Sequence, residues 1–183
     1  MTDGETCLRR AYAAILASDF ESAVEWFRQA AAAEPDNASY YYKGSISLAR
    51  SGRLDLALDY AQSAVRLAPE EPDYRLHLRL VEGRMLARQA KALLAKPQPE
   101  PDTAIELLEE AVELDPLDAG AYLLLGIACR LAGEYDRAIE ALRIAKEMNP
   151  MLLEAGKLLR ETKMDRARRW RLMYTNHTRR RNR

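Results

Sequence analysis

The sequence of 183 residues is poor in the side chains on which metal sites and disulfide frameworks depend. It contains two cysteines and two histidines. Cys7 and Cys129 lie far apart, without the close spacing of metal ligands, and two cysteines are too few for a disulfide framework. Neither a metal site nor a disulfide-stabilised fold is therefore predicted. Both cysteines fall on predicted helix faces and are interpreted as small, buried apolar residues.

Sequence motifs of catalysis are also absent. There is no phosphate-binding glycine loop, no nucleophile elbow and no paired-histidine zinc motif. His77 is better explained as a groove or surface residue than as a catalytic base, and His177 lies in a basic C-terminal segment. Acidic pairs such as Glu109–Glu110 are interpreted as solvated helix faces. The sequence predicts no enzyme activity, no catalytic residue, no metal and no cofactor.

Long apolar runs are missing as well. No stretch reaches the roughly 18 uninterrupted apolar residues of a membrane span. The N-terminus lacks the basic start and apolar run of a secretory signal, so we expect a cytoplasmic protein. Apolar residues still make up 48% of the chain and charged residues 31%. This composition is typical of a helical protein with a sizeable core.

What the sequence does contain is an internal repeat. Three series of residues recur with intervals of 34, then 47, then 34 positions. Alanine lets two helices cross closely, and proline ends a helix because it lacks an N–H and clashes with the preceding turn. The pattern predicts an all-α solenoid of about four antiparallel helix hairpins plus a C-terminal capping helix. The three series are Ala23, Ala57, Ala104 and Ala138; Ala30, Ala64, Ala111 and Ala145; and Pro35, Pro69, Pro116 and Pro150.

The predicted helices cover most of the chain. Four repeats and the capping helix are expected to form a single domain over residues 1–174, followed by a basic, flexible tail over residues 175–183. The predicted repeats are residues 4–37, 38–71, 72–118 and 119–152. The predicted helices are residues 5–17, 20–33, 38–50, 54–67, 72–95, 101–114, 119–131, 135–148 and 151–174.

The segment 121–150 resembles the tetratricopeptide repeat family. Residues 38–71 match that family well, and residues 4–37 match it mainly in their second helix. The resemblance implies helical hairpins stacked in a right-handed superhelix and a role in binding other proteins, but scaffolds of many kinds share this fold. The residues of segment 121–150 that carry it are Tyr122, Leu125, Gly126, Gly133, Tyr135, Ala138, Ala145 and Pro150.

The third repeat departs from the pattern because its interval is 47 positions instead of 34. Its first helix is predicted over residues 72–95, about 36 Å long against about 20 Å for a usual first helix. Leu86, Ala90, Leu93 and Leu94 continue an apolar stripe along the extension. We interpret the stripe as packing on a neighbouring repeat, with an oligomer or partner contact as the alternative.

The first helix of each hairpin has more apolar residues than packing within the hairpin requires. The resemblance implies that the first helices line a concave surface. An apolar groove with basic edges would bind an amphipathic helix or an extended peptide, apolar with some acidic character. The predicted groove residues are Leu8, Tyr12, Ile15, Tyr42, Lys43, Ile46, Arg50, Leu76, His77, Leu80, Arg84, Leu123, Ile127 and Arg130.

Other interpretations of these residues stay open. They could form the core of a tightly curled short array, or the chain's own last helix or a second copy could cover them. A carboxylate clamp, with which some members of this family hold the acidic tails of heat-shock chaperones, is not expected. The matching positions are largely Leu, Tyr and Ile, and Lys43 alone is not a clamp.

Charge is unevenly distributed, although Lys+Arg and Asp+Glu number 28 each. Residues 157–183 contain eleven Lys or Arg against Glu161 and Asp165, a net charge of +9, so residues 1–156 carry −9. The tail could be solvated, or contact RNA or DNA through phosphates and stacking, or lie on an anionic membrane. The basic residues singled out, with one tryptophan among them, are Arg166, Arg168, Arg169, Trp170, Arg171, Arg179, Arg180, Arg181 and Arg183.

These observations favour a protein-binding adaptor or scaffold. One alternative is a factor that associates with nucleic acid or an anionic membrane through the basic C-terminus. The other is a structural module that assembles with copies of itself as a homo-oligomer.

Overall fold

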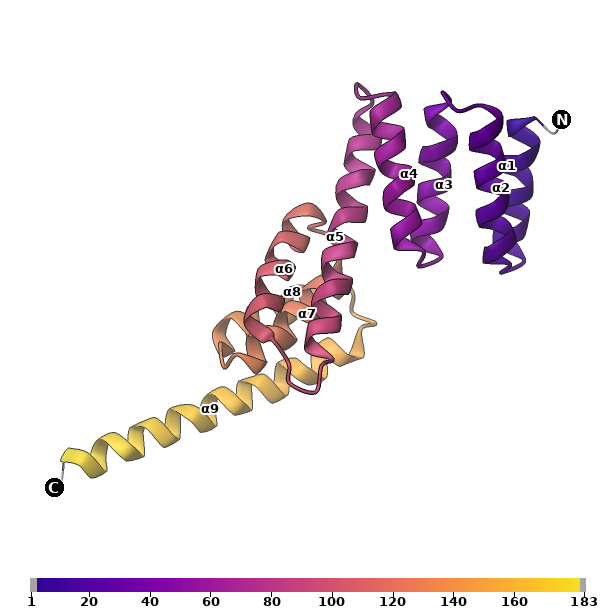
Figure 1. Ribbon diagram of the computed structural model, residues 1–183. Helices are drawn as coiled ribbons and strands as arrows, with labels where there is room; N and C mark the ends of the chain where they lie inside the picture. The colour runs from indigo at the N-terminus through magenta and orange to yellow at the C-terminus, as the bar shows by residue number, and fades with distance from the viewer. Residues whose placement is uncertain (1–2, 182–183) are drawn as a thin grey trace. The chain divides into compact units, whose positions relative to one another are not determined.

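The computed structural model describes the backbone of residues 3–181 and the side chains of residues 3–172. This part of the chain consists of α-helices joined by short turns and contains no strand (Figure 1). The predicted bounds agree with the observed ones within two residues, except at the end of the last helix. The helices are α1 (Gly4–Leu16), α2 (Phe20–Ala33), α3 (Ala38–Arg50), α4 (Leu54–Leu67), α5 (Pro72–Leu94), α6 (Pro101–Leu114), α7 (Ala119–Leu131), α8 (Tyr135–Met148) and α9 (Leu153–Arg181).

The tight turns inside the hairpins require a left-handed backbone. Gly52 and Gly133 have φ values of 78° and 79° in two of these turns, where glycine avoids the clash of a Cβ atom. Ser18 stands at the equivalent position of the first hairpin with φ 58°. A non-glycine residue in this conformation costs about 1–2 kcal/mol. The first turn is therefore the most strained of the three.

The chain divides into two compact units, Met1–Met85 and Leu86–Arg183, and the boundary falls inside α5. The N-terminal unit contains the hairpins α1–α2 and α3–α4, closed by the first half of α5. In the C-terminal unit, the second half of α5 and α6 come first, the hairpin α7–α8 follows, and α9 closes the unit (Figure 1). The longer interval in the repeat thus arises because one long helix belongs to both units.

The core of the N-terminal unit is built from alanines at the helix crossings and a few larger side chains. Phe27, Leu48 and Val81 are almost completely buried in one cluster with Ala23 and Ala57. Val81 comes from α5, so the first half of that helix completes this core. Small residues at the crossings let the backbones approach, and the larger side chains fill the space between them.

The core of the C-terminal unit follows the same plan. Ala90, Leu108 and Ala138 are fully buried in one cluster, with Leu86 and Leu93 packed against it. The apolar stripe on the extension of α5 therefore packs on neighbouring helices of the C-terminal unit. This confirms the first of the two interpretations drawn from the sequence.

The first half of α9 closes the C-terminal unit. Ala155 and Thr162 are fully buried, and Leu158 lies in a cluster with Leu142. Leu153 and Met164 of the same helix are exposed, because they lie on sides of α9 that do not face the α7–α8 hairpin.

The second half of α9 continues to Arg181, where the sequence analysis predicts a flexible tail from residue 175. Between Gly156 and the end of this helix there is neither proline nor a further glycine. Nothing in the sequence therefore ends the helix at residue 174, and arginine favours helical backbone.

Candidate partner-binding surface

Three rows of equivalent positions cross the first helices of the N-terminal unit, because these positions recur at the same interval in successive repeats. Each row takes one residue from α1, one from α3 and one from the first half of α5. The rows are Leu8, Tyr42 and Leu76; Tyr12, Ile46 and Leu80; and Leu16, Arg50 and Arg84.

Burial falls along the first row. Leu8 is buried, Tyr42 is half-buried, and Leu76 is 53% exposed. The Tyr42 ring lies 4.5 Å from the Tyr74 ring and meets His77 edge-on at 5.5 Å between centroids. Leu76 is exposed because α5 is the final helix of this unit, so no later helix of the unit follows it. Tyr74 was missed in the sequence analysis, which had no signal for a contact between helices.

The second row stays partly open along its whole length. Tyr12, Ile46 and Leu80 are each partly exposed, and so is Ile15. The Tyr12 ring packs edge-to-face on Phe27 with centroids 6.0 Å apart, and burial raises the pKa of its hydroxyl. Tyr12 is therefore anchored at one end of an apolar row that remains accessible to another molecule.

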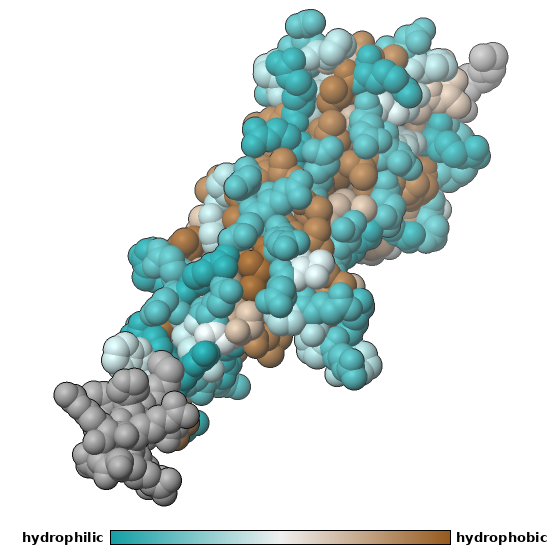
Figure 2. Space-filling model, turned by 60° about the vertical axis from the view of Figure 1, so that its left-hand side comes forward, coloured by the Kyte–Doolittle hydropathy of each residue, from teal (hydrophilic) through white to brown (hydrophobic). Residues whose placement is uncertain are grey.

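The third row borders the apolar one and is exposed. Leu16 is 88% exposed, and Arg50 and Arg84 are exposed as well. Lys43, from the middle of α3, is partly exposed. Leu16 was missed in the sequence analysis, although its place one repeat before Arg50 could have indicated it. On the face of the N-terminal unit that is visible in Figure 2, brown apolar surface lies between teal polar side chains.

His77 connects α5 to α3 through a buried hydroxyl. Ser45 is fully buried, and its Oγ donates to the backbone oxygen of Ala57 at 2.6 Å. Nε2 of His77 lies 2.8 Å from the same Oγ. A hydroxyl has only one proton, so the His77 Nε2–H must be the donor of this second bond. Burial, and next Arg84, lower the pKa of His77, so the ring is neutral at pH 7. His77 thus positions α5 within the predicted groove.

The equivalent surface of the C-terminal unit is covered. Leu123 is 8% exposed, and Ile127 packs against the same core cluster as residues of α9. Arg130 donates to Glu161 at 3.1 Å and to Asp165 at 2.7 Å, and the bond to Asp165 is the main reason why the pKa of Arg130 is raised. Leu123, Ile127 and Arg130 therefore do not line an open groove. They form the surface on which α9 packs, because α9 takes the place that the first helix of a further repeat would occupy.

Two of the predicted basic residues of α9 contact the α7–α8 hairpin. Arg166 forms an ion pair with Asp136 at 2.6 Å, and Arg169 donates to the backbone oxygen of Gly133 at 3.0 Å. Trp170 is 66% exposed, and Arg168 and Arg171 are exposed as well. The remaining predicted residues lie outside the residues whose side chains the structure describes; they are Arg179, Arg180, Arg181 and Arg183.

Reactive groups are not gathered at any of these described surfaces. Cys7 and Cys129 are free and buried, as predicted, and burial raises the pKa of the Cys129 thiol to about 11. Over the residues described, no group of three His, Cys, Asp or Glu side chains could hold a metal ion. In the same part of the chain, no helix combines the length and the apolar character needed to cross a membrane.

The regular spacing, the hairpins and the two cores agree with one sequence family. Tetratricopeptide repeats match residues 8–72 and residues 88–150. The chain belongs to the tetratricopeptide repeat family. The unmatched residues between the two segments lie in α5, on either side of the boundary between the units. This agrees with two short tetratricopeptide arrays that share one helix.

Solved structures with the same fold include several of MamA. The MamA RS-1 ArsTM double mutant is 20% identical, with a TM-score of 0.57 over 89% of this chain and 84% of that one. MamA 41-end from Desulfovibrio magneticus RS-1 is 21% identical, with a TM-score of 0.54 over 90% and 85%. At this identity the similarity establishes the fold alone. No curated protein sequence matches the chain.

Membership of the tetratricopeptide repeat family supports a role as a protein–protein interaction scaffold. Proteins of this family are in general interaction modules rather than enzymes. A scaffold of this kind is defined by the surfaces that it leaves open, because the fold itself is common to many functions.

Proposed function

We propose that this tetratricopeptide repeat protein is a scaffold that holds a helix or extended segment of another protein on the N-terminal unit. The observation that supports the proposal is the partly exposed row of Tyr12, Ile46 and Leu80, one residue from each of three successive first helices. A helix bound in a groove is held by apolar anchors about one turn apart. A row that crosses three helices offers several such anchors.

Charge beside the row defines the chemistry of the partner. Arg50 and Arg84 border the apolar row on two of its three helices, and Lys43 adds a third cation on α3. Opposite charges across an interface increase specificity and the rate of association. The partner is therefore apolar on one face, with carboxylates beside that face.

The C-terminal unit contains an internal example of this chemistry. There α9 packs its apolar residues, including Leu158, in one cluster with Leu123, and it directs Glu161 and Asp165 to Arg130. Leu123 is equivalent to Tyr42 in the repeat. A segment with leucines followed by carboxylates within two turns is thus already accepted by one surface of this type.

The test uses synthetic amphipathic helices of about four turns with a leucine stripe, flanked either by glutamates or by lysines. We expect the Leu/Glu peptide to bind the full chain at least about tenfold more tightly than the Leu/Lys peptide, a difference of about 1.4 kcal/mol. Ile46→Glu places a carboxylate in the middle of the apolar row and should abolish binding in isothermal titration calorimetry.

The matched control is Gln62→Glu, which adds the same charge at an exposed position of the second helix α4. It should leave peptide binding unchanged. Equal binding by Ile46→Glu and the unmodified chain would overturn the proposal, and so would a preference for the Leu/Lys peptide. If light scattering shows that Ile46→Glu dissociates an oligomer, the row is an interface between copies of this chain instead.

A further inference from the structure

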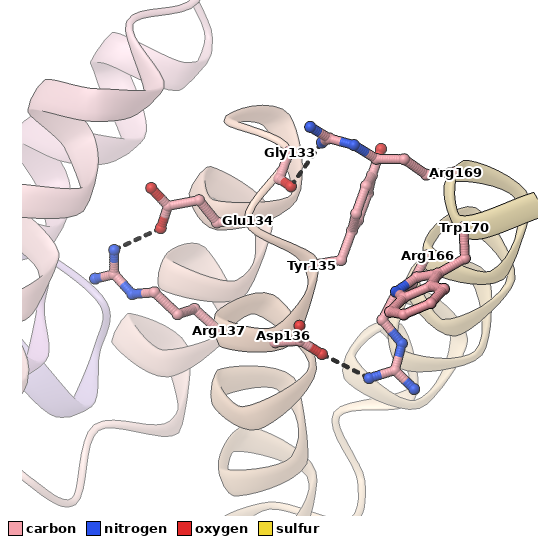
Figure 3. Close-up of a pocket in the computed structure, with 8 residues that line it drawn as sticks. All are labelled: Gly133, Glu134, Tyr135, Asp136, Arg137, Arg166, Arg169 and Trp170. Atoms are coloured by element: carbon pink, nitrogen blue, oxygen red, sulfur yellow. Dashed lines mark hydrogen bonds and ion pairs between the residues drawn. The ribbon is translucent and has the colours of Figure 1, made fainter. Parts of the chain in front are cut away.

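In the C-terminal unit, a shallow pocket of about 480 Å³ lies where α9 passes the turn between α7 and α8. Figure 3 shows aromatic and arginine side chains from α8 and α9 facing one another across it. Most of its lining is charged or aromatic. The lining residues are Gly133, Glu134, Tyr135, Asp136, Arg137, Arg166, Arg169 and Trp170.

The pocket presents an aromatic ring that the fold does not need for its core. Trp170 is 66% exposed although tryptophan is among the most strongly buried residues on average. Across the pocket, the Arg169 guanidinium lies 5.7 Å from the centre of the Tyr135 ring. Arg169 also donates to the Gly133 oxygen, and Arg166 pairs with Asp136 (Figure 3). These contacts hold the pocket side of α9 against α8 before any ligand arrives.

Charge at the C-terminal end of the sequence is of one sign, although the pocket itself also contains Glu134 and Asp136. Residues 166–183 contain eight arginines and no acidic residue. The last acids before them, Glu161 and Asp165, both pair with Arg130 and cannot balance the arginines that follow. Residues 1–156 carry a net charge of −9, so the arginine-rich end of the sequence is the part of the chain that attracts a polyanion most strongly.

The distribution of apolar residues on α9 argues against a membrane as the anion. A helix that lies on a bilayer gathers its apolar side chains on one face. Met164, Trp170 and Leu172 are all exposed, but a turn of about 100° per residue places them on three different sides of the helix. Arg168 and Arg169 fall between these sides. Over the part of α9 whose side chains are described, no apolar face is available to enter the lipid.

We infer that the pocket and the arginine-rich half of α9 bind single-stranded nucleic acid. One base stacks on the exposed Trp170 ring, and arginines, among them Arg168 and Arg169, contact the phosphates on either side. Stacking on an aromatic ring tolerates any base, and the phosphate contacts carry no sequence information. The site is therefore selective for unpaired strands and not for a particular sequence.

The experiment measures fluorescence anisotropy of labelled 20-nucleotide oligo(dT) and oligo(U), and of a 20-base-pair duplex, with the full chain between 50 and 300 mM salt. We expect the single strands to bind and their affinity to fall steeply with salt, because phosphate contacts release counterions. Trp170→Ala should weaken binding by about 5- to 150-fold, the loss expected for one stacked base, and Trp170→Phe should restore most of it.

Charge reversal separates the arginine contribution from folding. Arg168→Glu should weaken binding and reduce the salt dependence. Lys91→Glu, the same reversal at an exposed position of α5, should change neither. In a Trp26→Phe background, Trp170 is the only tryptophan, and oligonucleotide binding should quench its emission. Far-UV circular dichroism confirms that each variant is folded.

Several outcomes would overturn the inference. They are no binding to any oligonucleotide at 50 mM salt, unchanged binding by Trp170→Ala, and equal affinity for the duplex. Binding to vesicles of phosphatidylglycerol and phosphatidylcholine without binding to oligonucleotides would assign the site to membranes instead.

Discussion

Leu76 in the N-terminal unit and Leu123 in the C-terminal unit occupy equivalent repeat positions, yet Leu76 is 53% exposed and Leu123 is 8% exposed. The local sequences do not explain this difference, because both residues are leucines of a first helix. What differs is the element that follows in each unit. In the C-terminal unit, α9 follows the α7–α8 hairpin and packs on α7. In the N-terminal unit, α5 is the final helix. The end of an array thus decides whether a repeat position is core or surface.

The largest expected effect comes from removing a core side chain from one unit only. Phe27→Ala in the N-terminal core should cost about 3–5 kcal/mol of unfolding free energy. Hydrogen exchange should then show protection lost in α1 to α4 and retained in α6 to α8. Leu108→Ala, in the other core, should give the reverse pattern. Equal loss of protection throughout the chain in both variants would show that the units do not unfold separately.

A smaller effect concerns the close helix approach inside the α7–α8 hairpin. A Cβ on Gly126 would lie 2.5 Å from Cγ of the fully buried Leu142. Gly126→Ala should therefore destabilise the protein by about 1–3 kcal/mol in urea denaturation. Gly156 in α9 is the control, because its nearest neighbouring atoms would be 3.9 Å away. Gly156→Ala should stabilise the protein by about 0.5–1 kcal/mol. Two substitutions of the same sign would contradict this explanation.

A substitution at Arg130 directly tests why Leu123 is buried in one unit while Leu76 is exposed in the other. Arg130→Met leaves Glu161 and Asp165 close together without their common partner. We expect a loss of about 2 kcal/mol and faster hydrogen exchange in the first half of α9. Leu123 should then become more accessible to solvent. A variant that keeps slow exchange in α9 would show that apolar packing alone holds the helix.

The smallest effect is the pH dependence contributed by His77. Its pKa is lowered in the folded protein from an ordinary value of 6.5, so the unfolded chain binds the proton more readily. The contribution of His77 to stability is therefore complete above pH 6.5 and is lost as the pH falls below that value. Denaturant titrations at pH 7.5 and pH 5 should show a smaller difference for His77→Gln than for the unmodified chain. An unchanged difference would locate the pH dependence elsewhere.

Most of the fold was predictable because its signals are local. The alanine and proline series placed each helix within two residues, except at the end of α9, where residues 175–181 continue the helix. Repeat length also predicted which residues share a row. The role of α5 in two cores was not predictable, because the longer third interval indicates an insertion without showing which helices it contacts.

The candidate surface was predicted less completely than the fold. Tyr12, Ile46 and Leu80 are partly exposed as the repeat pattern suggests, but the burial of Leu123 depends on where α9 packs. The contact between His77 and Ser45 joins residues 32 positions apart. Side-chain contacts of this kind follow from how helices stack, and one sequence contains no direct signal for them.

The shared helix also has a consequence for folding. In an array of repeats, stability is a sum of terms for each repeat and for each interface between neighbours. Val81 and Ala90 both lie on α5, and each is buried in a different core. Unfolding one unit frees half of α5 and exposes the hydrogen bonds of the other half to fraying. We therefore expect a melting transition broader than that of one cooperative domain but narrower than that of two independent ones.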